Sequence, residues 1–422
     1  MNIDRKILTA AVDLAAKAVD AKSYMPILQT LVVRPVARTL TFEANALDYG
    51  ITVSVPVEQD SPRHAGAQDT PSLLNASTLK KALGLCAGGS VSLEPTDKAG
   101  YTVKAGSRRF TLPSAGDVAE FPLLPPEAKS CGKALALDAK AVTVDWAWLL
   151  RATGTDVTRA YTQAIYLDAK KDRAVTTDGH RLHVAPMPGL PASFLIPSTA
   201  AALILAAIKV ADTAPVELSL FGKADDGKAT TVRASVGSNG SGVSAVIWAR
   251  GVDADFPPID AVIPAAHATT AMISANTATA AAKLMLKWRN GSSCGAKLSL
   301  GEYGARLSLD HPENGEATEA IEGAITGPAI EVGLNPAYLV DALSRFEDAV
   351  TLKLTDDHSP VVVHAFHGDK RRFAILMPTE LLEKDDDAPT RISQRPEDRE
   401  EVSRSSRSPP KGRPDHPGHR LV

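Results

Sequence analysis

The chain has 422 residues, more than one ordinary hydrophobic core holds, so two to four domains are expected. Apolar residues make up 44% of it, and no apolar run approaches the roughly 18 residues that a membrane-spanning helix needs. The formal net charge of -3 excludes a uniformly basic nucleic-acid-binding chain, but not one whose basic residues gather on one surface.

Cysteine usage and the first residues indicate the compartment. The three cysteines, Cys86, Cys131 and Cys294, are far apart and odd in number, which supports neither a disulfide framework nor a zinc site. Residues 1–5 already include two charged side chains, Asp4 and Arg5, and lack the apolar stretch of a signal peptide. We therefore expect a cytoplasmic protein that does not associate with membranes.

The N-terminal region begins with an amphipathic pattern over residues 4–20, where apolar side chains recur every three or four positions and predict a helix. Strands are expected at 27–33, 40–44 and 51–57. A second helix is expected to start at the N-cap candidate Asn75 and to run through Leu85. Three short strands then follow, at 91–94, 101–104 and 109–112.

This order of elements recurs twice more. The segment around Asn75 resembles Ile196–Leu205 and Leu334–Leu343, at spacings of about 120–140 residues, and first-helix patterns occur at 4–20, 138–153 and 276–289. Accidental similarity between amphipathic segments is the alternative explanation. The repeated order favours an α+β fold with three similar two-helix, antiparallel-sheet domains.

Shifts in composition divide the chain. Proline-rich segments at 122–132 and 256–270 are the expected linkers, and residues after 382 contain too few apolar side chains to form a core. The predicted parts are domain 1 at 1–127, domain 2 at 133–262, domain 3 at 269–382, and a disordered charged tail at 383–422.

The most specific short motif is Thr176-Thr-Asp-Gly-His-Arg-Leu182, which follows a plausible strand at 164–168. Asp178-Gly179 favours a turn, which would present His180 and Arg181 at a corner between two strands. An Asp–His catalytic dyad, an ordinary solvated turn, and a corner that binds a partner peptide are the three interpretations. No nucleophile motif or metal-ligand spacing accompanies the first.

The corner belongs to a longer series of motifs. It is followed by Phe256-Pro-x-x-x-x-Val-Ile-Pro264 and Ile375-Leu-Met-Pro378, and preceded by Met25-Pro-Ile-Leu28 and Arg109-Phe-Thr-Leu-Pro113. In this order, and with the three repeats, residues 1–382 resemble the bacterial sliding clamps, the β subunits of DNA polymerase III. Further matches are Glu120-Phe-Pro122 and Leu354-Thr-Asp-Asp-His-Ser-Pro360.

The resemblance implies the DNA clamp fold and a ring made of two copies joined head to tail. Such a ring encircles double-stranded DNA and tethers the replicative polymerase, so that processivity comes from effective concentration. The implied partners are DNA, a second copy of the chain, the polymerase, the clamp loader and other proteins with clamp-binding peptides. The implied protein is not an enzyme: it has no catalytic residues, metal or cofactor.

A sliding ring needs positive charge only on the helices that line its hole, because phosphate contacts attract DNA without reading its sequence. For each cation the alternative is an ordinary solvated helix charge. Residues 200–208 are rich in alanine and lack cations, which favours weaker attraction there. The DNA-facing candidates are Lys6, Lys17, Lys22, Lys80, Lys81, Arg151, Lys209, Lys283, Lys287 and Arg289.

The resemblance also implies a peptide-binding cleft between domains 2 and 3, with apolar walls in which a flexible methionine suits varied partners. His180 and Arg181 are expected on its polar rim. The cleft residues carried over by motif are Arg159, Thr177, Gly179, His180, Arg181, Leu182, Pro257, Val262, Pro360, Ile375, Leu376, Met377, Pro378 and Leu381.

Two departures from the family pattern support alternatives. Glu380 stands where a basic residue is common, and about forty residues follow a strand that usually ends the chain. The additional residues, together with the alanine-rich helix, motivate as the alternative a clamp-fold DNA-binding or scaffold protein that forms no ring. An enzyme using Asp178 and His180 is a more distant alternative, since no Gly-rich phosphate loop or Cys/His cluster is found.

Overall fold

The computed structural model describes residues 1–36, 38–57, 71–122, 129–222, 229–291, 295–367 and 369–381. The predicted tail at 383–422 lies outside the described residues. Contacts join residues 1–382 into one compact unit, so the three domain boundaries stay predictions within it.

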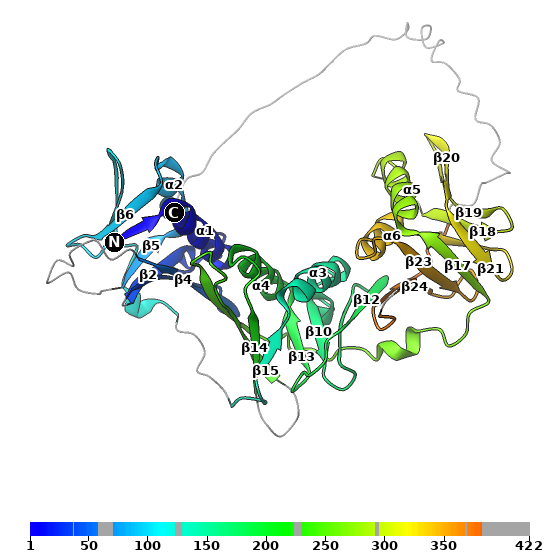
Figure 1. Cartoon of the computed structure of the whole chain (residues 1–422), viewed down its shortest axis with the longest axis horizontal. Helices are drawn as coiled ribbons and strands as arrows, with labels where there is room; N and C mark the ends of the chain where they lie inside the picture. Colours follow the sequence, from blue (N-terminus) through cyan, green and yellow to red (C-terminus); the bar gives the residue numbers. More distant parts are fainter. Residues whose placement is uncertain are drawn as a thin grey trace, which may run out of the picture. The chain divides into compact units, whose positions relative to one another are not determined.

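The same set of elements occurs three times along this unit, with two helices that contact each other in each set (Figure 1). The first set has helices α1 (Arg5–Ala15) and α2 (Ala76–Leu85). One of its sheets has the order β1 (Asn2–Asp4), β6 (Ser90–Pro95), β7 (Tyr101–Ala105), β8 (Arg108–Leu112). The other has the order β5 (Ser72–Asn75), β2 (Thr30–Val36), β3 (Thr39–Asn45), β4 (Tyr49–Pro56).

The second and third sets repeat both strand orders. The second has α3 (Ala139–Leu149), α4 (Ser198–Val210), β9 (Leu135–Leu137), β14 (Val216–Gly222), β15 (Ala229–Val236), β16 (Ser244–Arg250), and β13 (Phe194–Pro197), β10 (Ala164–Asp168), β11 (Arg173–Thr177), β12 (Arg181–Pro186). The third has α5 (Ala275–Trp288), α6 (Pro336–Leu343), β17 (Thr269–Ser274), β23 (Ala349–Leu354), β24 (Val361–Ala365), β25 (Phe373–Leu376), and β22 (Ile330–Leu334), β18 (Ala296–Gly301), β19 (Gly304–His311), β20 (Gly315–Ile321). An extra strand, β21 (Gly323–Thr326), pairs with β17.

Local chemistry explains where several elements begin. The Asn75 side chain accepts a hydrogen bond from the Thr78 amide at 3.1 Å, and Asn335 caps α6 from the same position in the third set. The expected helix over 4–20 is shorter, since α1 ends at Ala15 and a 3₁₀ turn, η1 (Ala16–Ala18), follows. The strand expected from residue 27 begins only at Thr30, because Pro26 opens a 3₁₀ turn, η2 (Pro26–Gln29).

Two strand pairs join the three sets into larger sheets. β4 pairs antiparallel with β16, which makes an eight-stranded sheet, and β12 pairs antiparallel with β25, which makes a nine-stranded sheet. In both junctions, the last strand of a sheet ordered like β5-β2-β3-β4 pairs with the last strand of a sheet ordered like β1-β6-β7-β8. Among the described strands, β20 and β8 are the equivalent last strands that take part in neither junction, and each lies at a sheet edge.

Candidate functional site

The corner between β11 and β12 is held by its own side chains. Asp178 Oδ1 accepts from the amides of His180 and Arg181 at 2.9 and 3.0 Å, and Thr177 Oγ1 donates to the Arg181 carbonyl at 2.7 Å. Gly179 has a φ of +92°, which favours glycine. The turn exposes Gly179 and His180, as the sequence predicts for a presented corner.

Arg181 is fastened rather than free. Its Nε donates to Asp178 Oδ2 at 3.0 Å, its Nη1 donates to Asp341 on α6, and its guanidinium carbon lies 4.4 Å from the centroid of the Tyr338 ring. The side chain is only 10% exposed. This differs from the expectation of a rim residue, because Asp178 of the same turn and two residues of α6 surround the guanidinium.

The terminal strand lies beside the corner. Arg181 pairs with Leu376 and Leu182 with Ile375 in the β12–β25 ladder, and the Met377 amide donates to the His180 carbonyl at 2.9 Å. The structure therefore brings together two motifs that lie nearly 200 residues apart in the sequence.

Burial divides the predicted cleft residues by position. Leu182, Ile375 and Leu376 are 4%, 1% and 1% exposed, so they belong to the packed interior beside the corner. Thr177 is also buried. The exposed members are Arg159, Gly179, His180 and Val262, and the half-buried members are Arg181, Pro257, Pro360, Met377, Pro378 and Leu381.

The linker after β16 packs against this part of the sheet. Ile259, in the 3₁₀ turn η6 (Ile259–Val262), is buried in a cluster with Leu182 and Ile375. Phe256 stacks on Tyr166 with ring centroids 4.6 Å apart. These contacts explain why the linker carries apolar residues at fixed spacing.

An ion-pair cluster fixes the linker. Asp260 accepts from Lys171 Nζ at 2.6 Å and from Arg173 Nη1 at 3.0 Å, while Arg173 Nε also donates to Asp168 at 3.0 Å. Hydrogen bonds from Arg173 and Lys171 lower the pKa of Asp260 to about 2. The carboxylate is therefore ionised at neutral pH and holds the linker against the β10–β11 turn.

A second ion-pair cluster joins the second set of elements to the third. Asp145 on α3 accepts from Arg345 Nε at 2.9 Å and from Arg372 Nε and Nη2 at 2.9 and 2.7 Å. Arg372 precedes Phe373, which pairs with Val184 at the end of the ladder away from the corner.

Sequence reasoning missed Tyr338, Asp341 and Asp260. Each lies within a segment whose pattern indicates something else, the repeated Asn335 signature or the linker motif. No spacing rule links α6 to the corner, because the contact joins residues about 160 positions apart in the sequence.

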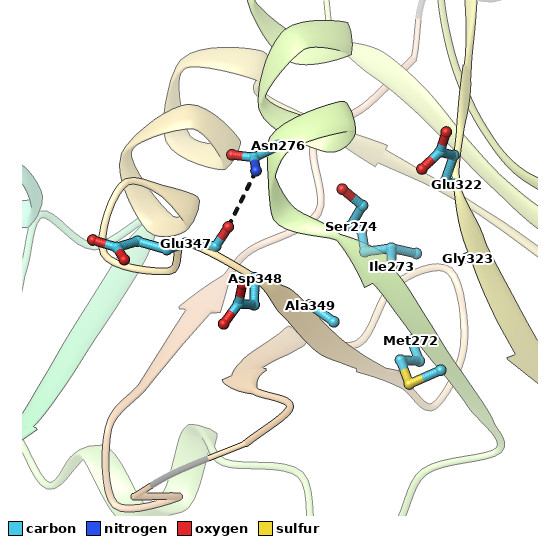
Figure 2. A pocket seen from close by; sticks show the side chains of 9 residues that line it. All are labelled: Met272, Ile273, Ser274, Asn276, Glu322, Gly323, Glu347, Asp348 and Ala349. Atoms are coloured by element: carbon cyan, nitrogen blue, oxygen red, sulfur yellow. Dashed lines mark hydrogen bonds between the residues drawn. The ribbon is translucent and has the colours of Figure 1, made fainter.

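A separate hollow lies in the third set, at the start of α5 (Figure 2). Its volume is about 400 Å³, and its lining residues include Glu322, Glu347 and Asp348. Asn276 Nδ2 donates to the Glu347 carbonyl at 3.2 Å across one side (Figure 2). It contains none of the predicted cleft residues, so it is not the cleft.

Metal ligands and membrane-spanning helices are absent from the described ranges. Within those ranges, no group of three or more His, Cys, Asp or Glu side chains is arranged to hold a metal ion. No helix in the part of the chain that the structure describes is long and apolar enough to cross a membrane.

Comparison with known proteins gives consistent matches. Residues 260–380 match the family model described as DNA polymerase III beta subunit, C-terminal domain. The beta sliding clamp of Caulobacter vibrioides is 25% identical over 385 residues, which cover 86% of this chain and 95% of that protein. The Escherichia coli beta sliding clamp is 23% identical over 392 residues, which cover 90% and 99%.

Solved structures agree with the fold. The DNA polymerase III beta subunit of Thermotoga maritima superimposes with a TM-score of 0.76 at 20% identity, covering 90% of this chain and 99% of that one. A Pseudomonas aeruginosa sliding clamp solved with griselimycin bound gives 0.77 at 21% identity over the same shares. The chain is therefore similar to the bacterial sliding clamps in sequence, and it has their fold.

The predicted DNA-facing cations of this chain lie on the helices or directly beside them. Lys80 pairs with Asp13 at 2.9 Å, and Arg151 pairs with Asp341 at 2.9 Å, so these two charges are partly neutralised. Arg289 is half-buried. Of the predicted cations, those with exposed side chains and no ion pair among the described residues are Lys6, Lys17, Lys22, Lys81, Lys209, Lys283 and Lys287.

Helix α4 is poor in cations, as are α3, which carries Lys140, and α6, which carries no lysine or arginine. Helix α4 carries one basic residue, Lys209, and its remaining exposed positions are small or apolar. Most of the predicted DNA-facing cations therefore lie in the first and third sets of elements.

Proposed function

We propose that this chain is a DNA sliding clamp: two copies join head to tail in a closed ring that encircles duplex DNA and tethers the replicative polymerase. The ring performs no chemistry of its own, and we place it in the cytoplasm with the replication proteins. It raises the effective concentration of its partners at the DNA, so tight DNA contacts are unnecessary.

The observation that carries the proposal is the repeated sheet junction. β4–β16 and β12–β25 are equivalent pairs, while β20 and β8 are the corresponding strands that lie at sheet edges. An unpaired edge strand is a template for another chain. Pairing β20 of one copy with β8 of the next repeats the junction and closes the ring after two copies, as a heterologous interface allows.

Charge on the two edges supports this pairing. Counting along the equivalent ladders, Thr318 corresponds to Thr52 and Val184, and Arg109 corresponds to their partners Val246 and Phe373. The same register puts Glu319 opposite Arg108 and Glu316 diagonal to Arg109. Opposite charges at such positions favour a strand pair, whereas two identical edges would repel.

We also propose that the corner, the linker and the segment Met377–Leu381 form the peptide-binding cleft. In this proposal the exposed Arg159, His180 and Val262 form the rim of the cleft, and buried apolar side chains form its floor. A partner peptide with leucine or phenylalanine anchors fits such a surface, because apolar contacts supply affinity and polar groups fix orientation. Candidate partners are the polymerase, the clamp loader and other clamp-binding proteins.

Measured mass separates the ring from its alternative. Light scattering should give a particle of about twice the 44.4 kDa chain mass. A monomer at micromolar concentration would instead favour a clamp-fold scaffold without a ring, the alternative that the cation-poor α4 supports.

A further inference from the structure

One carboxylate joins the corner to α6. Asp341 Oδ1 accepts from Arg151 at 2.9 Å, and its Oδ2 accepts from Arg181. Arg151 follows α3 and Arg181 begins β12, so Asp341 binds two separate points of the second set from a helix of the third.

The same face of α6 carries an aromatic support. Tyr338 precedes Asp341 by three residues, so the two side chains project from one side of the helix. The Tyr338 ring underlies the Arg181 guanidinium and stacks with His180, with ring centroids 6.1 Å apart. A guanidinium over an aromatic face is favourable, more so when water is excluded.

These contacts reach the exposed part of the corner directly. His180 is adjacent to Arg181 in sequence, and its carbonyl already accepts from Met377. The corner is thus held on one side by the terminal strand and on the other by α6. Without Asp341, the mostly buried guanidinium of Arg181 has one charged partner fewer, and it faces Arg151 with no carboxylate between them.

We propose that Asp341 is a positioning residue for the peptide-binding cleft: it fixes Arg181, and through Arg181 it sets the place of His180 relative to Met377 and Tyr338. In this account the Arg181 side chain holds the second and third sets of elements together, and the residues next to Arg181 contact the peptide. The inference rests on the proposed function of the cleft.

The chain offers a matched control. Asp145 also binds two arginines across the same junction, and it is 6% exposed. Its partner Arg372 adjoins the Phe373–Val184 end of the ladder, away from the Leu376–Arg181 end at the corner. Removing the charge of Asp145 should therefore weaken the junction without moving the corner.

The test uses the full-length protein and an uncharged, fluorescently labelled peptide with leucine and phenylalanine anchors. We expect D341N to weaken peptide binding about tenfold, D145N to change it less than about twofold while lowering the unfolding temperature, and D341E to recover part of the affinity. Amide exchange at residues 178–181 should rise in D341N only.

Each other outcome has a distinct meaning. Wild-type protein that fails to bind the peptide would overturn the cleft and this inference together. Wild-type binding that D341N leaves unchanged would overturn the inference alone. Equal weakening by D341N and D145N would also overturn it, because a purely structural role of the junction would then explain both.

Discussion

The indole of Trp148 and the imidazole of His183 stack with ring centroids 4.2 Å apart and an interplanar angle of 11°. His183 Nδ1 lies 2.9 Å from the Trp148 carbonyl, and Trp148 Nε1 donates to the Ala342 carbonyl on α6 at 3.0 Å. The pair is buried and links α3, β12 and α6. Burial lowers the pKa of His183 to about 3, so the ring is neutral and Nδ1 donates its proton.

This neutral histidine makes folding stability depend on pH. The ordinary pKa of 6.5 applies to the unfolded chain, which binds a proton between pH 6.5 and 3 while the folded chain does not. Stability should therefore fall as pH drops through this window, by up to about 1.4 kcal/mol per pH unit from this residue.

His183→Phe keeps a flat ring and removes the titration. It should be less stable than wild type at pH 7, by about 1–3 kcal/mol, because the Trp148 carbonyl is left without its donor. The difference in stability should shrink as pH falls, since only the wild type is destabilised when its unfolded chain binds a proton at this position. Urea unfolding at pH 7, 6 and 5 measures this, and parallel pH profiles for the two proteins would contradict the assignment.

Gly50 permits the close approach of β4 and β16. A Cβ at this position would lie 2.6 Å from Trp248 Nε1 and 2.7 Å from the Ala44 carbonyl. Gly50→Ala should therefore destabilise the protein by about 1–3 kcal/mol. Gly84→Ala, in α2, meets nothing within 4 Å and should stabilise it by about 0.5–1 kcal/mol. Thermal unfolding of both variants decides whether steric contact, rather than the replacement of glycine itself, sets the sign of the change in stability.

Much of the repeat was predictable because its signals are local. Asn75 and Asn335 are capping residues that precede apolar helical patterns, and both cap helices in the structure. Asp178-Gly179 predicted the corner by turn chemistry alone. The 3₁₀ turns were missed, since Pro26 and residues 16–18 give no signal that distinguishes a short turn from the neighbouring element.

The site was less predictable because its contacts are not local. The motif resemblance named Leu182 and Ile375 as cleft residues, but the sheet and the linker residue Ile259 cover their side chains. The partners of Arg181 lie on α6, and no periodicity of the sequence indicates that contact. The sequence therefore names the segments of the proposed cleft, whereas tertiary packing decides which of their side chains are exposed.

The proposed β20–β8 junction predicts a charge effect on assembly. Arg108→Glu places like charges opposite Glu319 and should weaken the dimer about tenfold or more. Glu319→Arg combined with Arg108→Glu restores the opposite signs and should recover most of the affinity. Sedimentation over a concentration series measures the dissociation constant, and a double variant no better than the single would refute this register.

The cations of α5 predict the salt dependence of DNA binding. Lys283→Ala with Lys287→Ala should lower the slope of log affinity against log salt by about 0.9 for each phosphate that is no longer neutralised. Lys297→Ala is the control, because Lys297 pairs with Glu331 at 3.2 Å on a sheet. Equal slopes for the α5 variant and wild type would remove Lys283 and Lys287 from the DNA-facing surface.

The central claim is a ring held on DNA by topology. The most direct measurement loads the protein onto nicked circular DNA with a clamp loader, removes free protein by gel filtration, and then cuts the circle. The account predicts that the protein stays with the circle and leaves once the DNA is linear. Retention on the linear product to the same extent would contradict it, because binding would then depend on contacts rather than on encirclement.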